Sequence, residues 1–271
     1  MPVLPVVPVA QPELELASRV ASWAEVLKAS VDPSIVTDVQ LADKINATGL
    51  PWRVYDRVTG IEMVLIPPGK YMRGASSGDS EARVDERPIH QVTITRAFYL
   101  GVCLVTQGEW SKLMGGNPSK FKGDRLPVER VSWEDIQPFL QESGDLRLLT
   151  EGEWEYACRA GGRGARYGEL GDTTWYEYNS KGRTQVVGGK RANGFGLHDM
   201  LGNVWEWCSD WYGVYPGTPQ TDPQGPSSGP HRVLRGGSWS SSGRNCRASL
   251  RGFNSPTGSN DDIGFRVART P

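Results

Sequence analysis

The spacing of apolar residues predicts helices near the start of the chain. Over residues 13–30 apolar side chains recur near helical spacing, which indicates an amphipathic helix. Asp32-Pro33 interrupts this pattern, and a second, shorter helix is expected over residues 35–46. The repeated prolines of residues 1–11 favour an extended tail, because proline suits neither a helix interior nor a central strand. Residues 1–51 are therefore expected to be a Pro-rich tail with short helices that pack on the rest of the chain or dimerise.

From Trp52 onward the pattern changes to short strands and capped helices. Apolar runs over residues 53–56 and 61–66 predict a hairpin, and residues 90–100 predict another strand pair. Three helices are expected to begin after the capping residues Thr106, Ser132 and Thr150. Beyond residue 161, Gly, Pro and Asn occur every few positions, which predicts loops and short strands. This pattern is typical of an α+β domain over residues 52–271.

The acidic residues of the third predicted helix, Glu151, Glu153 and Glu155, are interpreted as the solvated face of a capped helix. A pair of catalytic acids would be the alternative, but no other recognisable catalytic motif accompanies them. The sequence has neither a G-x-S-x-G elbow nor a phosphate-binding loop.

Composition adds that the domain is rich in loops and held together by aromatic residues. Among 271 residues there are 33 Gly and 19 Pro, but also ten Trp and nine Tyr, which supply large buried areas and argue against disorder. The net charge of −1 gives no general attraction to nucleic acid or anionic membranes. No basic segment precedes the apolar N-terminus and no apolar run could span a bilayer, so we expect a soluble, cytoplasmic or particle-associated protein without a signal peptide or membrane insertion.

Several motifs appear in an order that resembles the formylglycine-generating-enzyme, or sulfatase-modifying-factor, family across about residues 52–270. The most specific strings are Leu148-Leu149-Thr150-Glu151-Gly152-Glu153-Trp154-Glu155-Tyr156-Ala157, Gly196-Leu197-His198-Asp199-Met200-Leu201-Gly202-Asn203-Val204-Trp205-Glu206-Trp207, Arg235-Gly236-Gly237-Ser238-Trp239 and Ile263-Gly264-Phe265-Arg266. The resemblance implies a C-type-lectin-like fold with small twisted antiparallel sheets, a few helices and long irregular loops. Because one fold hosts several functions, activity has to be judged from the site residues.

The residues that the family's enzymes use are incomplete here. The oxidases of the family bind copper through a pair of cysteines shortly after the Gly-Gly-Ser-aromatic string, but only Cys246 follows Trp239 in this sequence. The family's iron-dependent sulfoxide synthases use three histidines, whereas His90, His198 and His231 are isolated from one another. We therefore predict a non-catalytic protein without copper or iron; the alternative is an oxidase-like or other sulfatase-modifying-factor enzyme.

The segment after Trp239 has a composition that suits a binding surface. From Val233 to Pro271 there is no Lys, Glu, Gln or Met, and Ser, Gly, Asn, Asp, Arg and Thr predominate. Adaptable hydrogen-bonding side chains around a few apolar contacts are typical of antibody paratopes. The expected ligand-binding segment is 240–262, with contacts from Ser240, Ser241, Ser242, Ser249, Leu250, Gly252, Phe253, Asn254, Ser255, Ser259, Asn260 and Asp261.

This composition also resembles the variable proteins of diversity-generating retroelements, a subgroup with the same fold. In that subgroup adenines of the terminal coding segment are rewritten, and codons with a fixed final pyrimidine cannot encode the missing amino acids. The alternative is an ordinary glycine-rich terminus of the family. The resemblance implies an unidentified protein or cell-surface ligand, no nucleic acid, and rigid support from Trp205, Trp207, Trp211, Trp239, Arg235 and Arg266.

The resemblance further implies a structural calcium site at Asp199, Gly202, Val204 and Glu206. In the family two carboxylates and two backbone carbonyls surround the ion. Hard oxygen ligands are the ones that Ca²⁺ prefers.

Overall fold

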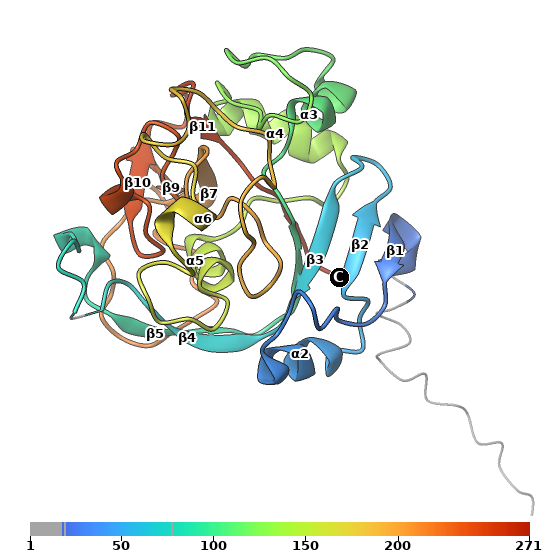
Figure 1. Cartoon of the computed structure of the whole chain (residues 1–271), viewed down its shortest axis with the longest axis horizontal. Helices are drawn as coiled ribbons and strands as arrows, with labels where there is room; N and C mark the ends of the chain where they lie inside the picture. The colour runs from blue at the N-terminus through green and yellow to red at the C-terminus, as the bar shows by residue number, and fades with distance from the viewer. Residues whose placement is uncertain (1–17, 19, 77) are drawn as a thin grey trace, which may run out of the picture.

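Three small sheets arranged around one apolar core make up most of the regular structure. The computed structural model describes residues 18, 20–76 and 78–271 (Figure 1). The largest sheet is antiparallel throughout and has the order β1-β2-β3-β6-β12, with strands β1 (Ala24–Lys28), β2 (Arg53–Asp56), β3 (Glu62–Ile66), β6 (Phe98–Gly101) and β12 (Ala268–Arg269).

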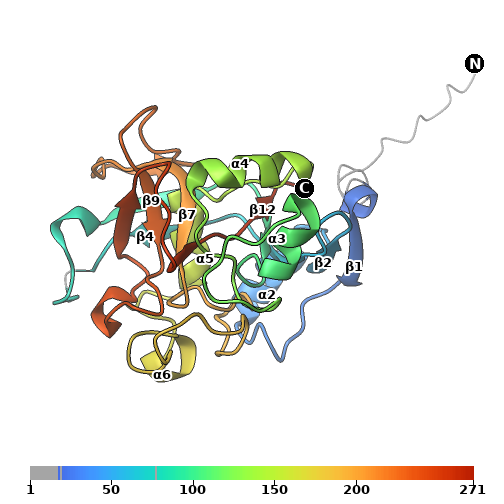
Figure 2. The same ribbon diagram turned by 90° about the horizontal axis from the view of Figure 1, so that it is seen from above.

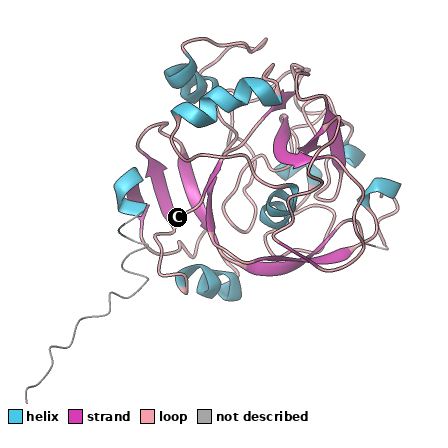
Figure 3. Cartoon of the chain, turned by 180° about the vertical axis from the view of Figure 1, so that it is seen from behind, coloured by secondary structure: helices cyan, strands magenta, loops and turns pink. Residues whose placement is uncertain are grey.

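The two smaller sheets are mixed. One has the order β10-β9-β7-β11, with β10 (Arg251–Asn254), β9 (Arg232–Arg235), β7 (Trp205–Trp211) and β11 (Ile263–Gly264). The other has the order β4-β5-β8, with β4 (Gly69–Arg73), β5 (His90–Ile94) and β8 (Gln220–Thr221). Antiparallel sheets were expected, but β11 runs parallel to β7 and β8 runs parallel to β5, so these two sheets are mixed. The α+β class itself, with small sheets, few helices and long loops, is confirmed (Figure 3).

The three capped helices form where the sequence predicts them. They are α3 (Gln107–Met114), α4 (Trp133–Glu142) and α5 (Glu151–Arg159). In α5 the Thr150 hydroxyl accepts a hydrogen bond from the Glu153 backbone N–H, and the Glu153 carboxylate accepts one from the Thr150 N–H. The shorter helical elements are α2 (Val39–Asn46), α6 (Leu170–Thr173), η1 (Val84–Glu86) and η2 (Gly243–Asn245). Within the described residues, every helix is too short or too polar to cross a lipid bilayer.

The helix expected over residues 13–30 is wrong for its second half, because residues 24–28 form strand β1 on the edge of the largest sheet. Helical spacing of the apolar residues misled the prediction, since Val26 and Leu27 stay exposed and only Ala24 is buried. Pairing with the open edge of β2 decides the conformation, so tertiary hydrogen bonding outweighs local periodicity. Residues 13–17 of that helix and the tail over residues 1–11 lie outside the described residues.

The second N-terminal helix is shorter than expected and packs on the main core. It begins after Asp38, whose carboxylate accepts a hydrogen bond from the Leu41 backbone N–H at 3.1 Å, and not at residue 35. Leu41 and Ile45 are buried in the same apolar cluster as the central sheet. The part of the N-terminal region described here therefore shares the core of the domain.

Helix α5 lies near the middle of the molecule and carries two buried carboxylates (Figure 1). Glu151 forms ion pairs with Arg73 of β4 at 2.6 Å and with Arg251 of β10 at 2.7 Å. Glu155 pairs with Arg235 of β9 at 2.6 Å. The predicted solvated face is thus wrong for both glutamates, which instead tie the helix to strands of two sheets.

The arginines of this buried cluster outnumber its two glutamates, and their remaining N–H groups donate to backbone carbonyls. Arg235 donates to the carbonyl oxygens of Ser249 and Leu250 at 3.0 and 2.6 Å. Arg159, which also pairs with Glu155, donates to the carbonyl of Gly74 at 2.9 Å. Such hydrogen bonds are what a buried guanidinium requires, because desolvation would otherwise exceed the gain from pairing.

Replacing Glu155 by Gln should destabilise the fold strongly, because it removes the buried counter-charge of Arg159 and leaves Arg235 with its longer, 3.6 Å contact to Glu151. We expect a loss of about 3–5 kcal/mol in the free energy of unfolding, measured by urea denaturation. Asp145→Asn is the matched control, since the Asp145 side chain is 84% exposed and its pair with Arg269 should contribute less than about 1 kcal/mol. Equal losses in the two variants would contradict this role of Glu155.

The ion pairs of Glu155 with Arg159 and Arg235 should make the free energy of unfolding depend on pH in the acid range. Burial alone would raise the pKa of Glu155, but Arg159 and Arg235 outweigh it and the pKa lies below its usual value. A lowered folded-state pKa gives stability that is present above the unfolded pKa of about 4.3 and lost as pH falls below it. Between pH 6 and pH 3 the Gln variant should therefore lose less stability than the unmodified protein.

Candidate functional site

The main chain of the segment 240–262 is held from beneath by buried arginines. The segment includes β10, the edge strand of the β10-β9-β7-β11 sheet, and lies in the red part of the chain in Figure 2. Arg235, fully buried, binds the carbonyls of residues 248–250. Arg247, within the segment, forms a two-pronged pair with Glu86 at 2.6 and 2.7 Å and a further contact with Asp79 at 2.9 Å. The path of the backbone is thus set by interior contacts.

Arg247 and Arg251 were not among the predicted site residues. Both are almost completely buried, although they lie in a segment whose polar composition suggests exposure. An arginine needs an acidic partner to be buried, and the partners Glu86 and Glu151 precede them by 161 and 100 residues. No local pattern in the segment could have identified those pairs.

Most of the predicted ligand-binding residues reach the surface, but three do not. Ser240, Phe253, Ser259 and Asn260 are exposed, and Ser242, Gly252, Asn254, Ser255 and Asp261 are partly exposed. Ser241, Ser249 and Leu250 are buried, which corrects the expectation that they face a ligand. The reason is that the chain turns inward to bring Arg247 and Arg251 to their acids. The Ser249 hydroxyl then donates to Glu86 at 2.7 Å.

The two ends of the segment meet at Trp239. Its indole N–H donates to the carbonyl of Asp261 at 3.0 Å, and its ring meets Phe121 edge to face at 5.6 Å. The Ser240 hydroxyl donates to the Asp262 carboxylate at 3.0 Å. These bonds place Ser240 beside the exposed residues 259–261.

The middle of the segment is an exposed aromatic platform on β10. Phe253, 51% exposed, packs against Tyr212 at 4.6 Å and His231 at 4.9 Å between ring centroids. Its neighbour Gly252 faces Trp205, where an added Cβ would come within 3.1 Å of the indole. The Trp205 backbone N–H bonds to the carbonyl of Asp262 at 2.8 Å, so β10 and the end of the segment share one support. We call the accessible residues of segment 240–262 the 240–262 surface.

Cys246 has no second cysteine near it in the sequence after Trp239. The thiol is fully buried beneath Gly237, where an added Cβ would come within 2.9 Å of the sulfur. Burial raises the pKa of Cys246 to about 12, so it stays a thiol at neutral pH and is a poor metal ligand. All four cysteines are free.

The three histidines lie in separate environments. His90 packs on Tyr215, His198 bonds to the carbonyl of Lys190, and His231 packs on Phe253. In the described part of the chain no three His, Cys, Asp or Glu side chains are grouped to hold a metal. A three-histidine iron site is therefore not formed by these residues.

The predicted calcium residues include one carboxylate oxygen that is free to bind a hard cation. Asp199 accepts a hydrogen bond from the Gly188 N–H at 2.7 Å with Oδ2, whereas its buried Oδ1 has no partner among the described residues. Glu206 is bound through both oxygens by Arg266 at 3.1 and 3.2 Å. Burial raises the pKa of both carboxyl groups by more than the nearby Arg266 guanidinium lowers it. A cation held by Asp199, Glu206 and the carbonyls of Gly202 and Val204 would supply the missing charge.

Comparison with known proteins places these features in a family. Residues 54–271 match the sulfatase-modifying factor enzyme 1-like domain. The chain is 35% identical over 240 residues to the serine/threonine-protein kinase pkn1 of Chlamydia caviae, a match that covers 77% of this chain and 38% of the kinase. It is 40% identical over 186 residues to the formylglycine-generating enzyme of Streptomyces coelicolor, covering 60% of this chain and 59% of the enzyme. The matches thus span less than two thirds of either relative.

Two solved structures resemble the domain over nearly their whole length. Treponema denticola variable protein 1 superposes with a TM-score of 0.70 and 29% identity, covering 78% of this chain and 95% of that protein. PvdO from Pseudomonas aeruginosa superposes with a TM-score of 0.74 and 28% identity, covering 81% and 98%. The predicted resemblance is confirmed: the chain belongs to the sulfatase-modifying factor enzyme 1-like domain family.

Proposed function

We propose that this domain is a non-catalytic ligand-binding protein whose 240–262 surface contacts a protein or a cell-surface structure. The observation that carries the proposal is the separation of roles within the segment. Arg235, Arg247 and Arg251 hold its backbone from the interior. The side chains of Ser259 and Asn260 take part in no hydrogen bond or ion pair with other described residues, so they are available to a ligand.

Diversification of this surface is the second part of the proposal. The similarity to the Treponema variable protein supports it, as does the absence of Lys, Glu, Gln and Met from Val233 onward. A backbone that is held independently of its exposed side chains tolerates many side chains at the same positions. The aromatic platform around Phe253 supplies a large, rigid contact of the kind found in paratopes.

The competing proposal is an oxidase like the family's formylglycine-generating enzymes. It is disfavoured by the single cysteine after Trp239 and by the burial of its thiol. Two thiolates held close together are needed to bind copper as a soft-ligand pair.

Substitutions in the 240–262 surface should leave the fold intact where the side chain is exposed. For Ser259→Tyr and Asn260→Tyr we expect changes within about 0.5 kcal/mol in the free energy of unfolding, because neither side chain is packed. The buried Leu250 is the contrasting position, and Leu250→Ala should cost about 2–5 kcal/mol. Urea denaturation of the three variants measures this difference.

The coding sequence should show the same division between exposed positions, which vary, and buried positions, which do not. A near-identical copy of the segment encoding residues 233–266, differing only at adenines, is expected beside a reverse-transcriptase gene, with its differences at exposed positions. For the protein variants, a loss of stability in Ser259→Tyr and Asn260→Tyr as large as that in Leu250→Ala would refute a backbone that is held independently of its exposed side chains. If both the copy and the reverse-transcriptase gene are absent, ligand binding stands without diversification.

The purified domain should not oxidise a Cys-x-Pro-x-Arg peptide in the presence of copper and oxygen. Oxygen consumption and the mass of the peptide are the measurements, with a formylglycine-generating enzyme as the positive control. Turnover that disappears in Cys246→Ser would overturn the non-catalytic assignment.

Calcium should raise the midpoint of thermal unfolding if Asp199 and Glu206 hold a cation in the native state. Saturation at a hundred times the dissociation constant corresponds to about 2.7 kcal/mol of added stability. Asp199→Ala should abolish the shift, whereas Asp145→Ala, at an exposed acid, should retain it. Identical midpoints in EDTA and in millimolar calcium would rule out the site.

A further inference from the structure

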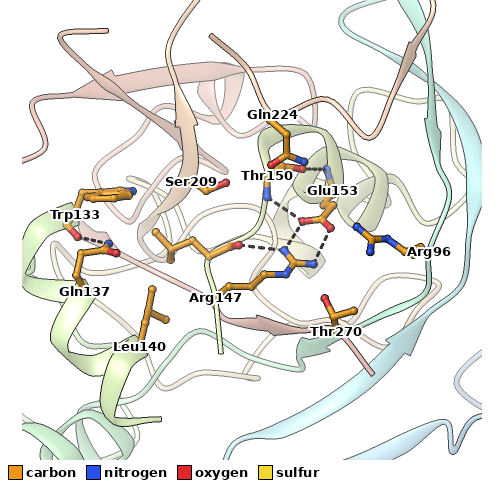
Figure 4. A pocket seen from close by; sticks show the side chains of 11 residues that line it. Arg96, Trp133, Gln137, Leu140, Arg147, Thr150, Glu153, Ser209, Gln224 and Thr270 are labelled. Atoms are coloured by element: carbon orange, nitrogen blue, oxygen red, sulfur yellow. Dashed lines mark hydrogen bonds and ion pairs between the residues drawn. The ribbon is translucent and has the colours of Figure 1, made fainter. Parts of the chain in front are cut away.

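A pocket of about 460 Å³ lies beside the first turn of α5, and no residue of the segment 240–262 lines it. Its walls include Arg96, Trp133, Gln137, Arg147, Gln224 and Thr270 (Figure 4). The volume falls in the range of about 300–1,000 Å³ that is usual for small-molecule sites. The pocket is therefore large enough for a ligand of its own.

One of the two arginines in this pocket is already neutralised. Arg147 donates two parallel hydrogen bonds of 2.7 and 2.8 Å to the Glu153 carboxylate. Glu153 also accepts the hydrogen bond from the Thr150 N–H that caps α5. Both carboxylate oxygens are thus engaged, and Glu153 has little capacity left for another cation.

The second arginine, Arg96, is an exposed residue at the rim of the pocket and has no counter-charge among the described residues. Its side chain forms neither a hydrogen bond nor an ion pair with the described residues, and its guanidinium points toward the Arg147–Glu153 pair inside the pocket (Figure 4). The preceding residue, Thr95, is held in place, since its N–H donates to the Asp222 carboxylate at 2.9 Å and its hydroxyl donates to the same group. With two arginines and one glutamate, the lining carries one net positive charge.

The opposite wall is apolar and rigid. It is formed by Trp133 and Leu140 of α4. The indole N–H of Trp133 donates to the carbonyl of Cys208 at 3.2 Å, and the Arg232 guanidinium lies 3.9 Å from the centre of its ring. The Trp133 ring is thus locked in place before any ligand arrives, which lowers the entropic cost of binding.

We propose that this pocket binds a small carboxylate with an apolar body, either an N-acylated amino acid or the C-terminal residue of a peptide. Arg96 would bind the carboxylate through its planar fork, which matches the two carboxylate oxygens. The apolar side chain would lie against Trp133 and Leu140, and Gln137 and Thr270 would offer polar contacts. A single uncompensated guanidinium suits a monoanion better than a phosphate group with nearly two charges.

Binding of N-acetyl-leucine, followed by two-dimensional NMR, tests this site. We expect saturable shifts of the Trp133 indole signal and the Gln137 side-chain amide, and at least about tenfold weaker binding of the uncharged N-acetyl-leucinamide. Arg96→Gln should weaken N-acetyl-leucine by about tenfold or more, as for loss of a hydrogen-bonded charge. Arg57→Gln is the control, because Arg57 is exposed and outside the pocket.

A second ligand distinguishes the two sources of the carboxylate. A hexapeptide ending in leucine should bind about as well as N-acetyl-leucine if the ligand is a free acid, and at least about tenfold more tightly if it is a peptide terminus. The proposal is overturned if no saturable shift appears at Trp133 with either ligand, if the amide binds equally well, or if Arg57→Gln weakens binding as much as Arg96→Gln. Thermal unfolding of both variants confirms that they are folded.

Discussion

The ion pairs of Glu151 and Glu155 join parts of the chain that are far apart in sequence. The two carboxylates lie on one face of α5 because they are four residues apart, and they reach arginines of β4, β9 and β10. Removing two acids from water is costly, so the arrangement persists only because each is paired and hydrogen-bonded. Arg235, held by Glu155, then organises the carbonyls of residues 248–250. The terminal segment thus depends on a helix about a hundred residues earlier.

This dependence allows structure and recognition to be divided within one segment. Arg247, Ser249, Leu250 and Arg251 point inward and determine the backbone, whereas Phe253, Ser259 and Asn260 point outward. Burial of the Cys246 thiol belongs to the same inward turn. A surface built in this way can change its side chains without refolding, which is the physical basis of the proposed binding role.

The opposite side of α5 has a different use. Glu153, between the two buried glutamates, points toward Arg147 and lines the Arg96 pocket. The 3.6-residue period of the helix separates these two sets of acids onto different faces. One helix therefore supports two surfaces of different chemistry: a broad face of polar and aromatic side chains, and a small pocket with one unpaired guanidinium.

The sequence by itself determined the capped helices, the family and the presence of a single cysteine after Trp239. These depend on local information: Thr150 and Glu153 bond to each other's backbone, and a missing second cysteine is visible without coordinates. Tertiary structure alone decided that residues 24–28 are a strand, that Glu151 and Glu155 are buried, and that Ser249 and Leu250 face inward. Strand pairing at a sheet edge and ion pairing join residues that are distant along the chain. Polar composition does not distinguish a solvated arginine from one that is buried in an ion pair with a carboxylate. The position of Arg96 in a pocket follows from the same long-range geometry.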